Sequence, residues 1–107
     1  MDRGHPKLAP LADAMNPGVL RLIARTAEGA HVHGRWVGVC GGMASDPQAV
    51  PILVGLGVDE LSVSVPTIPA VKATVRARSL AECQGLVQQA LAQDTAAGVR
   101  ALVPVEL

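Results

Sequence analysis

The N-terminal third of the sequence contains a helical repeat of apolar residues. Four apolar side chains are spaced so that they share one face: Val19, Leu20, Ile23 and Ala27. Charged residues occupy the other faces, which is typical of an amphipathic helix. Asn16-Pro17 supplies a capping side chain and a first-turn proline. We therefore expect a helix from residue 17 to about residue 30 that stops by Gly34.

A second helical repeat lies in the C-terminal third. Five residues form its apolar stripe: Leu80, Cys83, Val87, Ala90 and Leu91. Ser79 and Glu82, three positions apart, match the capping box that satisfies backbone donors at a helix start. The pattern predicts a helix that begins after Ser79 and ends near residues 93–94.

Between these helices, short apolar runs alternate with turn residues. We expect, in order, a strand over residues 35–40, a glycine turn at 41–42, a helix over 47–56, a strand over 61–65 and a helix from 66–69 to about 78. The helix over 47–56 is apolar on nearly every side and should be buried all round. Asp46-Pro47 gives its start signal. Strand, helix and strand in this order favour parallel pairing.

The two ends of the chain have no clear period. Residues 1–15 are expected to form an irregular lead-in, and residues 95–107 a tail in which Pro104 argues against a helix to the end. Two parallel strands with three or four helices do not close a sheet, and both sheet edges stay open. The fold class is therefore α/β, as a segment of a larger domain. A complete eightfold barrel needs about 250 residues.

Composition narrows the classes of partner. Of the 107 residues, 50% are hydrophobic but only 1% are aromatic, and the formal net charge is zero. A nucleic-acid surface needs concentrated positive charge and stacking aromatics, so we expect no nucleic-acid partner. No apolar run suits a membrane span, and the N-terminus lacks the apolar stretch of a signal peptide. We expect a cytoplasmic protein without membrane insertion, in which both cysteines stay reduced.

Cys40 is the main candidate for chemistry, because it stands where a strand ends and a glycine turn begins. Chemistry in parallel α/β folds gathers at this end of the strands. A thiol there could act as an acid or a nucleophile, whereas the competing interpretation is a small buried hydrophobic residue. Cys83 lies on the apolar stripe of the last helix, so we expect it to pack in the core.

Other polar residues give weaker indications. His5, His31 and His33 could suggest a metal site, but no carboxylate or cysteine lies at useful spacing, so we predict no metal ligands in this chain. Arg3 on its own is typical of a solvated terminal residue. Asp59 and Glu60 would point to opposite faces of a strand, which favours a role at the strand entry over acid–base catalysis.

Five stretches in this order and spacing resemble the C-terminal end of enzyme I, the phosphoenolpyruvate–protein phosphotransferase of the bacterial sugar phosphotransferase system. They are Met1-Asp2-Arg3-Gly4, Asn16-Pro17-x-Val19-Leu20-x-Leu22-Ile23, Gly38-Val39-Cys40-Gly41, Leu56-Gly57-Val58-Asp59-Glu60-Leu61-Ser62-Val63-Ser64 and Ile68-Pro69. The resemblance covers roughly residues 1–95. Cys40-Gly41-Gly42-Met43-Ala44-Ser45-Asp46 looks most like the multidomain fructose-type phosphoryl transfer proteins, since many enzyme I sequences have glutamate at the position of Gly42.

The resemblance implies that residues 1–107 are the C-terminal segment of a (β/α)8 barrel, with residues 16–94 as its βα units and helices. It implies that Cys40 gives and takes the proton at the methylene carbon of enolpyruvate, and that Arg3 binds the substrate phosphate. It also implies phosphoenolpyruvate and pyruvate as substrate and product, Mg²⁺ in the parent enzyme, and the carrier protein HPr as phosphate acceptor. The family's metal-binding carboxylates and phosphorylated histidine have no counterpart in this chain, so we expect the isolated chain to be inactive.

Two alternatives remain at this point. Pyruvate phosphate dikinase and phosphoenolpyruvate synthase share the barrel and a Cys-Gly loop, so the chain could be a fragment of one of these nucleotide-using enzymes. It could also be a non-catalytic binding or dimerisation module. The open sheet edges and the apolar helix over 47–56 lead us to expect self-association, most simply as a homodimer.

Overall fold

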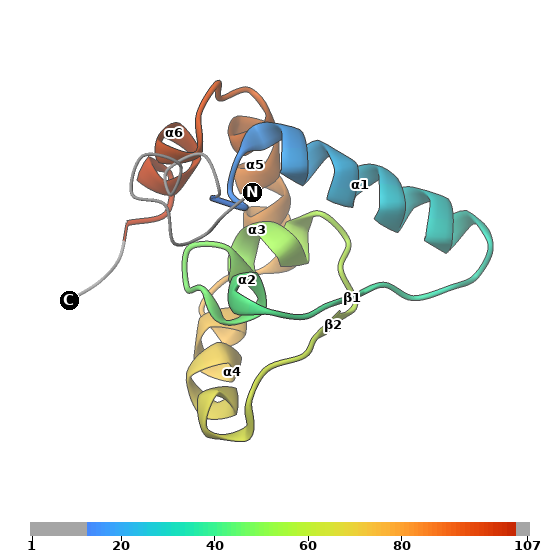
Figure 1. Ribbon diagram of the computed structural model, residues 1–107, viewed down its shortest axis with the longest axis vertical. Coiled ribbons are helices and arrows are strands. Elements are labelled where there is room, and N and C mark those ends of the chain that lie inside the picture. The colour runs from blue at the N-terminus through green and yellow to red at the C-terminus, as the bar shows by residue number, and fades with distance from the viewer. Residues whose placement is uncertain (1–12, 105–107) are drawn as a thin grey trace.

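The computed structural model describes residues 13–104, which form six α-helices and a two-stranded parallel sheet. The elements are α1 (Pro17–Val32), β1 (Gly38–Val39), α2 (Gly42–Ser45), α3 (Val50–Gly55), β2 (Glu60–Leu61), the 3-10 helix η2 (Val65–Thr67), α4 (Ile68–Arg76), α5 (Leu80–Leu91) and α6 (Ala96–Ala101). Figure 1 shows α3 and α5 at the centre, with α1 extending to one side. This arrangement is a small, helix-rich α/β unit, as far as residues 13–104 go.

The core is built around α3, which is buried on most of its surface as its composition predicts. Val50, Ile52 and Leu53 are fully buried. On α5, Cys83 and Ala90 are buried as well. The two helices meet at Gly55, where an added Cβ would overlap the carbonyl of Cys83. Glycine therefore lets the two backbones touch, and Cys83 packs in the core as predicted.

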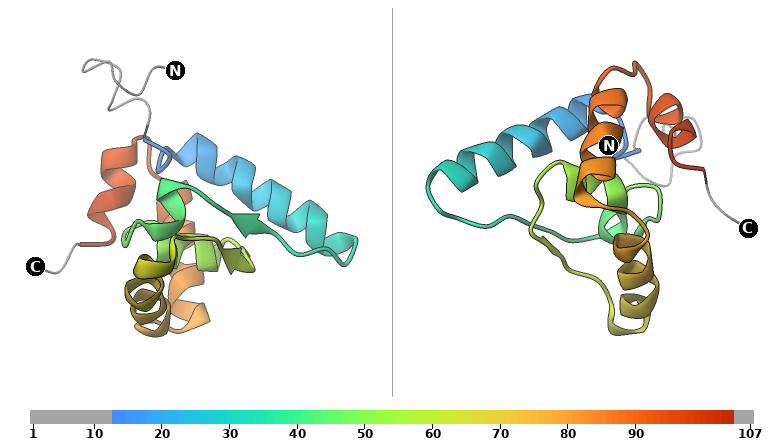
Figure 2. Two further views of the ribbon diagram at one scale, coloured as in Figure 1. Left: turned by 60° about the horizontal axis from the view of Figure 1, so that its bottom comes forward. Right: turned by 180° about the vertical axis from the view of Figure 1, so that it is seen from behind.

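Helix α1 joins this core at one end and the sheet at the other. Asn16 caps it by accepting a hydrogen bond from the Gly18 amide at 2.9 Å, which confirms the predicted start. Arg21 donates to the Leu91 carbonyl of α5 at 2.7 Å. Both views in Figure 2 show the C-terminal half of α1 reaching away from α3 and α5 before the chain returns to β1.

The sheet is parallel as predicted, but shorter. Gly38 pairs with Glu60 and Val39 pairs with Leu61. The expected strands over 35–40 and 61–65 are wrong in length, because a ladder needs partners on both strands and only two residue pairs align. Val65, expected at a strand end, begins η2 and is 77% exposed.

Two helices were not predicted and one begins late. Helix α2 has four residues, too few for a period to be visible, and α6 lies in the tail expected to be irregular. Thr95 caps α6 by accepting from the Gly98 amide at 3.0 Å. Helix α3 begins at Val50 and not at Pro47, because Asp46 starts a turn before it. Within the described part of the chain, no helix is both long and apolar enough to cross a membrane.

Candidate functional site

Cys40 follows β1 directly and is exposed, at the carboxyl end of the strand as predicted. The Val39 carbonyl, in the peptide before it, accepts a hydrogen bond from the Ser62 amide at 2.8 Å, so β2 fixes the backbone up to this point. The next residue, Gly41, has φ +87°, a conformation that side chains other than glycine rarely adopt. The chain therefore turns sharply at Cys40 and presents the thiol to solvent.

The turn after Cys40 leads into α2, which is anchored by one buried side chain. Ala44 is fully buried, and its amide donates to the Gly41 carbonyl at 3.1 Å. No atom lies within 4 Å of a Cβ placed on Gly41 or Gly42, so the space beside these glycines is open. A ligand could approach the backbone here as closely as it could approach the thiol.

Beyond α2, Asp46 and Arg100 form an ionic cluster with Asp13. Arg100 on α6 donates two hydrogen bonds to the Asp13 carboxylate, at 2.7 and 2.8 Å. Its Nη1 lies 2.9 Å from Asp46 Oδ2. The Arg100 guanidinium lowers the pKa of Asp13, and the hydrogen bonds with the two carboxylates raise the pKa of Arg100. The cluster joins three segments that are distant in sequence through one guanidinium.

The entry to β1 is held by a second polar contact. Asp59 Oδ2 lies 2.7 Å from His31 Nε2 and accepts a hydrogen bond from the Val37 amide at 2.9 Å. The hydrogen bond with His31, followed by that from Val37, lowers the pKa of the Asp59 carboxyl. Asp59 thus acts at the strand entry as predicted. In residues 13–104, no group of three His, Cys, Asp or Glu side chains lies close enough together to hold a metal ion. His31 is paired with the single carboxylate of Asp59.

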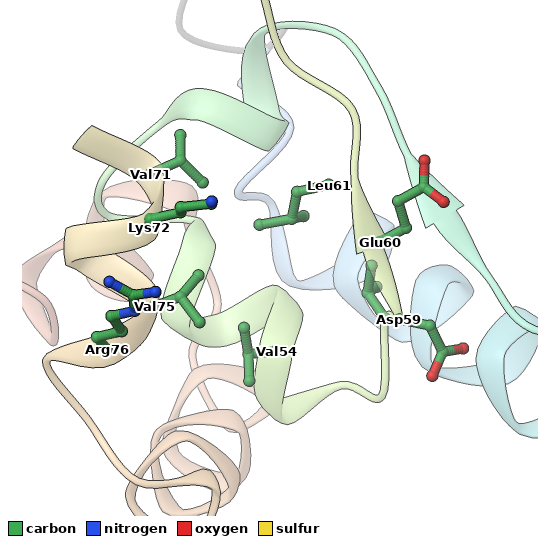
Figure 3. A pocket seen from close by; sticks show the side chains of 9 residues that line it. Val54, Asp59, Glu60, Leu61, Val71, Lys72, Val75 and Arg76 are labelled. Atoms are coloured by element: carbon green, nitrogen blue, oxygen red, sulfur yellow. The ribbon is translucent and has the colours of Figure 1, made fainter. Parts of the chain in front are cut away.

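Two hollows lie away from Cys40. One of about 260 Å³ lies between β2 and α4, where Leu61 points toward α4 while the carboxylates of Asp59 and Glu60 point to the other side of the strand (Figure 3). Lys72 and Arg76 of α4 stand at its edge. The other, of about 500 Å³, lies between α4 and the segment around Val103. Neither hollow includes Cys40, so the thiol lies on an open surface of the described chain.

The structure separates the predicted site residues into three groups. Cys40 is exposed at the strand end, and Cys83 is buried, which raises the pKa of its thiol. Arg3 and His5 lie outside the described residues. Sequence reasoning missed Arg100, because a single arginine in a weakly periodic tail gives no signal of partners 54 and 87 residues away.

Comparison with known proteins places this geometry in context. Residues 1–80 match the family model described as "PEP-utilising enzyme, PEP-binding domain". A multiphosphoryl transfer protein of Xanthomonas campestris pv. campestris is 54% identical over 102 residues, which cover 95% of this chain and 12% of that protein. One from Rhodobacter capsulatus is 51% identical over the same shares. A phosphoenolpyruvate-protein phosphotransferase of Haloferax volcanii is 41% identical over 105 residues, 98% of this chain and 19% of that protein.

The chain therefore spans about an eighth of the multiphosphoryl transfer proteins that it matches and about a fifth of the Haloferax phosphotransferase. The family match ends at residue 80, after α4. All of α5 after its first residue, and the whole of α6 with Arg100, lie beyond it.

Proposed function

The chain belongs to the family of PEP-binding domains of PEP-utilising enzymes, and from this premise we propose that it is part of a phosphoenolpyruvate–protein phosphotransferase. The parent enzyme moves phosphate from phosphoenolpyruvate to one of its own histidines and then to the carrier HPr, in the course of sugar uptake in the cytoplasm. The named relatives support this choice, because those reported above are multiphosphoryl transfer proteins or phosphotransferases. They do not favour a nucleotide-using dikinase or synthase, or a non-catalytic module.

The role that we assign to Cys40 follows from the chemistry of the substrate. When the histidine nitrogen attacks phosphorus, the bond from phosphorus to the enol oxygen breaks and an enolate of pyruvate remains. A proton must then reach the methylene carbon. We assign that transfer to the Cys40 thiol, which leaves a thiolate and pyruvate, and which runs in reverse as proton abstraction. The single observation that carries the assignment is the exposed thiol at the carboxyl end of β1, directly before Gly41 at φ +87°.

The remaining groups of the site are assigned from the resemblance. Arg3 would bind the substrate phosphate through its fixed charge and forked donors. The parent enzyme would use Mg²⁺ to offset charge on the phosphoryl group. Residues 13–104 offer no cluster of three candidate ligands, so this part of the chain does not fit the metal and we derive no step through it.

The isolated chain should accordingly be inactive. Phosphoryl transfer depends mostly on positioning and on electrostatic stabilisation of the transferring group. One arginine for the phosphate, with no cluster of metal-binding side chains among residues 13–104, would supply little of either. Exchange of isotope between pyruvate and phosphoenolpyruvate, measured on the chain alone, should stay at background, and clear turnover would contradict the proposal.

The two cysteines provide a matched test in the parent enzyme. Cys40→Ala should lower kcat for pyruvate formation by about 10²- to 10⁴-fold, the usual contribution of a positioned acid or base. Cys83→Ala, in the core of the same segment, should leave kcat within about threefold and lower stability instead. If Cys40→Ala retained full activity, the proposed role of the thiol would be wrong.

The proposal that the chain self-associates, most simply as a homodimer, now depends on the sheet edges alone. Helix α3, whose apolar surface also suggested self-association, is covered by α4 and α5 within the chain. Light scattering of the purified chain at rising concentration tests the proposal. A constant monomer mass would count against it.

A further inference from the structure

Arg100 occupies a central position among polar side chains of the described chain. From one guanidinium it contacts the carboxylates of Asp13 and Asp46 and the side-chain carbonyl of Gln48, all within 2.9 Å. The two bonds to Asp13 are parallel, which is the strong forked geometry available to arginine and not to lysine. One side chain of α6 thus ties together the segment before α1 and the segment between α2 and α3.

Gln48 makes the connection reciprocal. Its side-chain nitrogen, Nε2, donates to the backbone carbonyl of Arg100 at 3.1 Å and to that of Val103 at 2.8 Å. The Arg100 carbonyl lies in the last turn of α6, where it also accepts from the Val103 backbone amide at 3.1 Å, and the Val103 carbonyl follows just after the helix. The segment after Asp46 therefore satisfies the end of α6, while α6 satisfies the charge of Asp46.

The backbone that carries Arg100 is held by packing on either side. Val99 is fully buried and Val103 is 2% exposed, so the helix is anchored in the core one residue before and three residues after Arg100. The guanidinium itself is held by its hydrogen bonds and ion pairs with Asp13, Asp46 and Gln48.

Asp46, at the other end of the ion pair, lies six positions after Cys40 in the sequence. Between Cys40 and Asp46 lie Gly41 and the four-residue helix α2, which begins at Gly42. Ala44 is the buried side chain of α2, and the half-buried Met43 packs against the core beside it. These contacts hold the middle of the loop, whereas the two glycines next to Cys40 restrict the backbone little, so a contact from beyond the loop adds to what sets its conformation. Asp46 is the point at which a side chain beyond the loop can do so.

We propose that Arg100 is a positioning residue for the loop over residues 40–48, and that α6 thereby controls where the Cys40 thiol stands. The inference rests on the proposed function only in that it treats this thiol as the proton donor. Arg100 makes no contact with Cys40 in the described chain and acts through Asp46 and Gln48. The residue lies beyond the end of the family match at residue 80.

Amide hydrogen exchange on the 107-residue chain tests the structural half of the proposal. In Arg100→Ala, the Ala44 and Asp46 amides, which bond within the loop, should exchange roughly tenfold faster, because a charge-assisted contact no longer holds the loop closed. The Leu53 and Leu56 amides of α3 should not change. Arg100→Lys should give a partial effect, since lysine cannot contact both carboxylates through a fork.

Two further variants keep this test decisive. Asp46→Asn retains the oxygen that accepts from the Gln48 amide at 2.9 Å but removes the charge facing Arg100, so it should speed exchange in the loop even if Arg100→Ala does not fold. Arg25→Ala, an exposed arginine on α1, is the control and should change nothing. An unchanged loop in the folded variants, or a rise shared equally by Leu53, would overturn the proposal.

Kinetics of the parent enzyme test the functional half. Arg100→Ala should lower kcat by roughly tenfold with KM changed by less than about twofold, because the thiol is displaced while substrate binding is left intact. Arg100→Lys should recover part of the loss. An equal change in both constants, or none, would contradict the role. If the parent made no pyruvate from phosphoenolpyruvate at all, the proposed function would fail, whereas the exchange result would still decide whether Arg100 holds the loop.

Discussion

The contact between α3 and α5 differs sharply from the contact between β1 and β2. The helices touch through backbone at Gly55 and enclose fully buried side chains such as Ile52 and Leu53. The strands share two residue pairs, and Trp36 at the entry is 67% exposed. Buried apolar contact determines local stability, so the helices hold the chain together. The sheet is held by the half-buried Val39 and Leu61 against the core and by Asp59 at its entry, and the loop after Cys40 is tied down by the pair of Asp46 and Arg100.

The largest expected effect compares a leucine from each region. Leu53→Ala, in the fully buried centre of α3, should lower the free energy of unfolding by about 2–5 kcal/mol, through lost burial and a residual cavity. Leu61→Ala, on half-buried β2, should lower it by about 1 kcal/mol. Urea denaturation followed by circular dichroism measures both. Equal losses would mean that the sheet is packed as tightly as the helices.

A pair of glycines makes the same comparison with added volume. Gly55→Ala should cost about 1–3 kcal/mol, because the new methyl group meets backbone of α5 that cannot move away without separating the helices. Gly38→Ala in β1 places its methyl group 3.3 Å from the far end of the exposed Trp36 side chain, which can rotate aside. Its effect on unfolding should stay within about 0.5 kcal/mol. A tolerant Gly55 would contradict the close approach of α3 and α5.

Two serines extend the comparison to the start of helix α5 and the end of strand β2. Ser79 caps α5 by accepting from the Glu82 amide at 3.1 Å, while Glu82 accepts from the Ser79 amide at 3.0 Å. Ser79→Ala should therefore cost about 1 kcal/mol. The exposed hydroxyl of Ser62, after β2, has no hydrogen-bond partner among residues 13–104, so Ser62→Ala should be neutral within about 0.5 kcal/mol. Thermal melts of both variants at one pH decide the point.

The smallest expected effect is local and depends on pH. Folding lowers the pKa of Asp59 below its ordinary value of 3.8, so the native state favours the charged carboxylate. Its contribution is present above pH 3.8 and is lost as the pH falls through the lowered value. The NMR signal of the Val37 amide should shift in that range, and Asp59→Asn should abolish the shift. A Val37 signal that titrates identically in both proteins would show that the hydrogen bond to Asp59 does not form.

Helices with strong end signals could be predicted from the sequence. Asn16-Pro17 and the Ser79–Glu82 capping box gave the starts of α1 and α5 correctly, because both signals are local hydrogen bonds between residues two or three positions apart. The burial of α3 could be predicted from residues 47–56 for a different reason: a helix that is apolar on every side has no face to turn to solvent. The position of Cys40 at the end of β1 followed from the glycines after it.

Long-range features could not be predicted in this way. The alternation over 61–65 indicates a strand but cannot show that pairing extends only to Leu61, since that depends on β1. Asp46 was taken as the start signal of the helix over 47–56, which is wrong because Asp46 starts a turn and α3 begins only at Val50. Its pairing with Arg100 depends on where α6 packs. A six-residue helix such as α6 has too few positions to reveal its face. The role of Arg100 thus needs the folded chain, while the candidacy of Cys40 does not.

The length of α1 has a consequence for how this chain can vary. Arg21 binds the Leu91 carbonyl near one end and His31 meets Asp59 near the other, so two fixed attachment points lie ten positions apart on one helix. Removing one residue between them would turn His31 by about 100° around the helix axis and away from Asp59. A change of seven residues restores the direction of His31 but shifts it by about 10 Å along the helix axis, so no insertion or deletion here should keep both contacts, whereas changes in length after Val32 can be absorbed by the loop before β1.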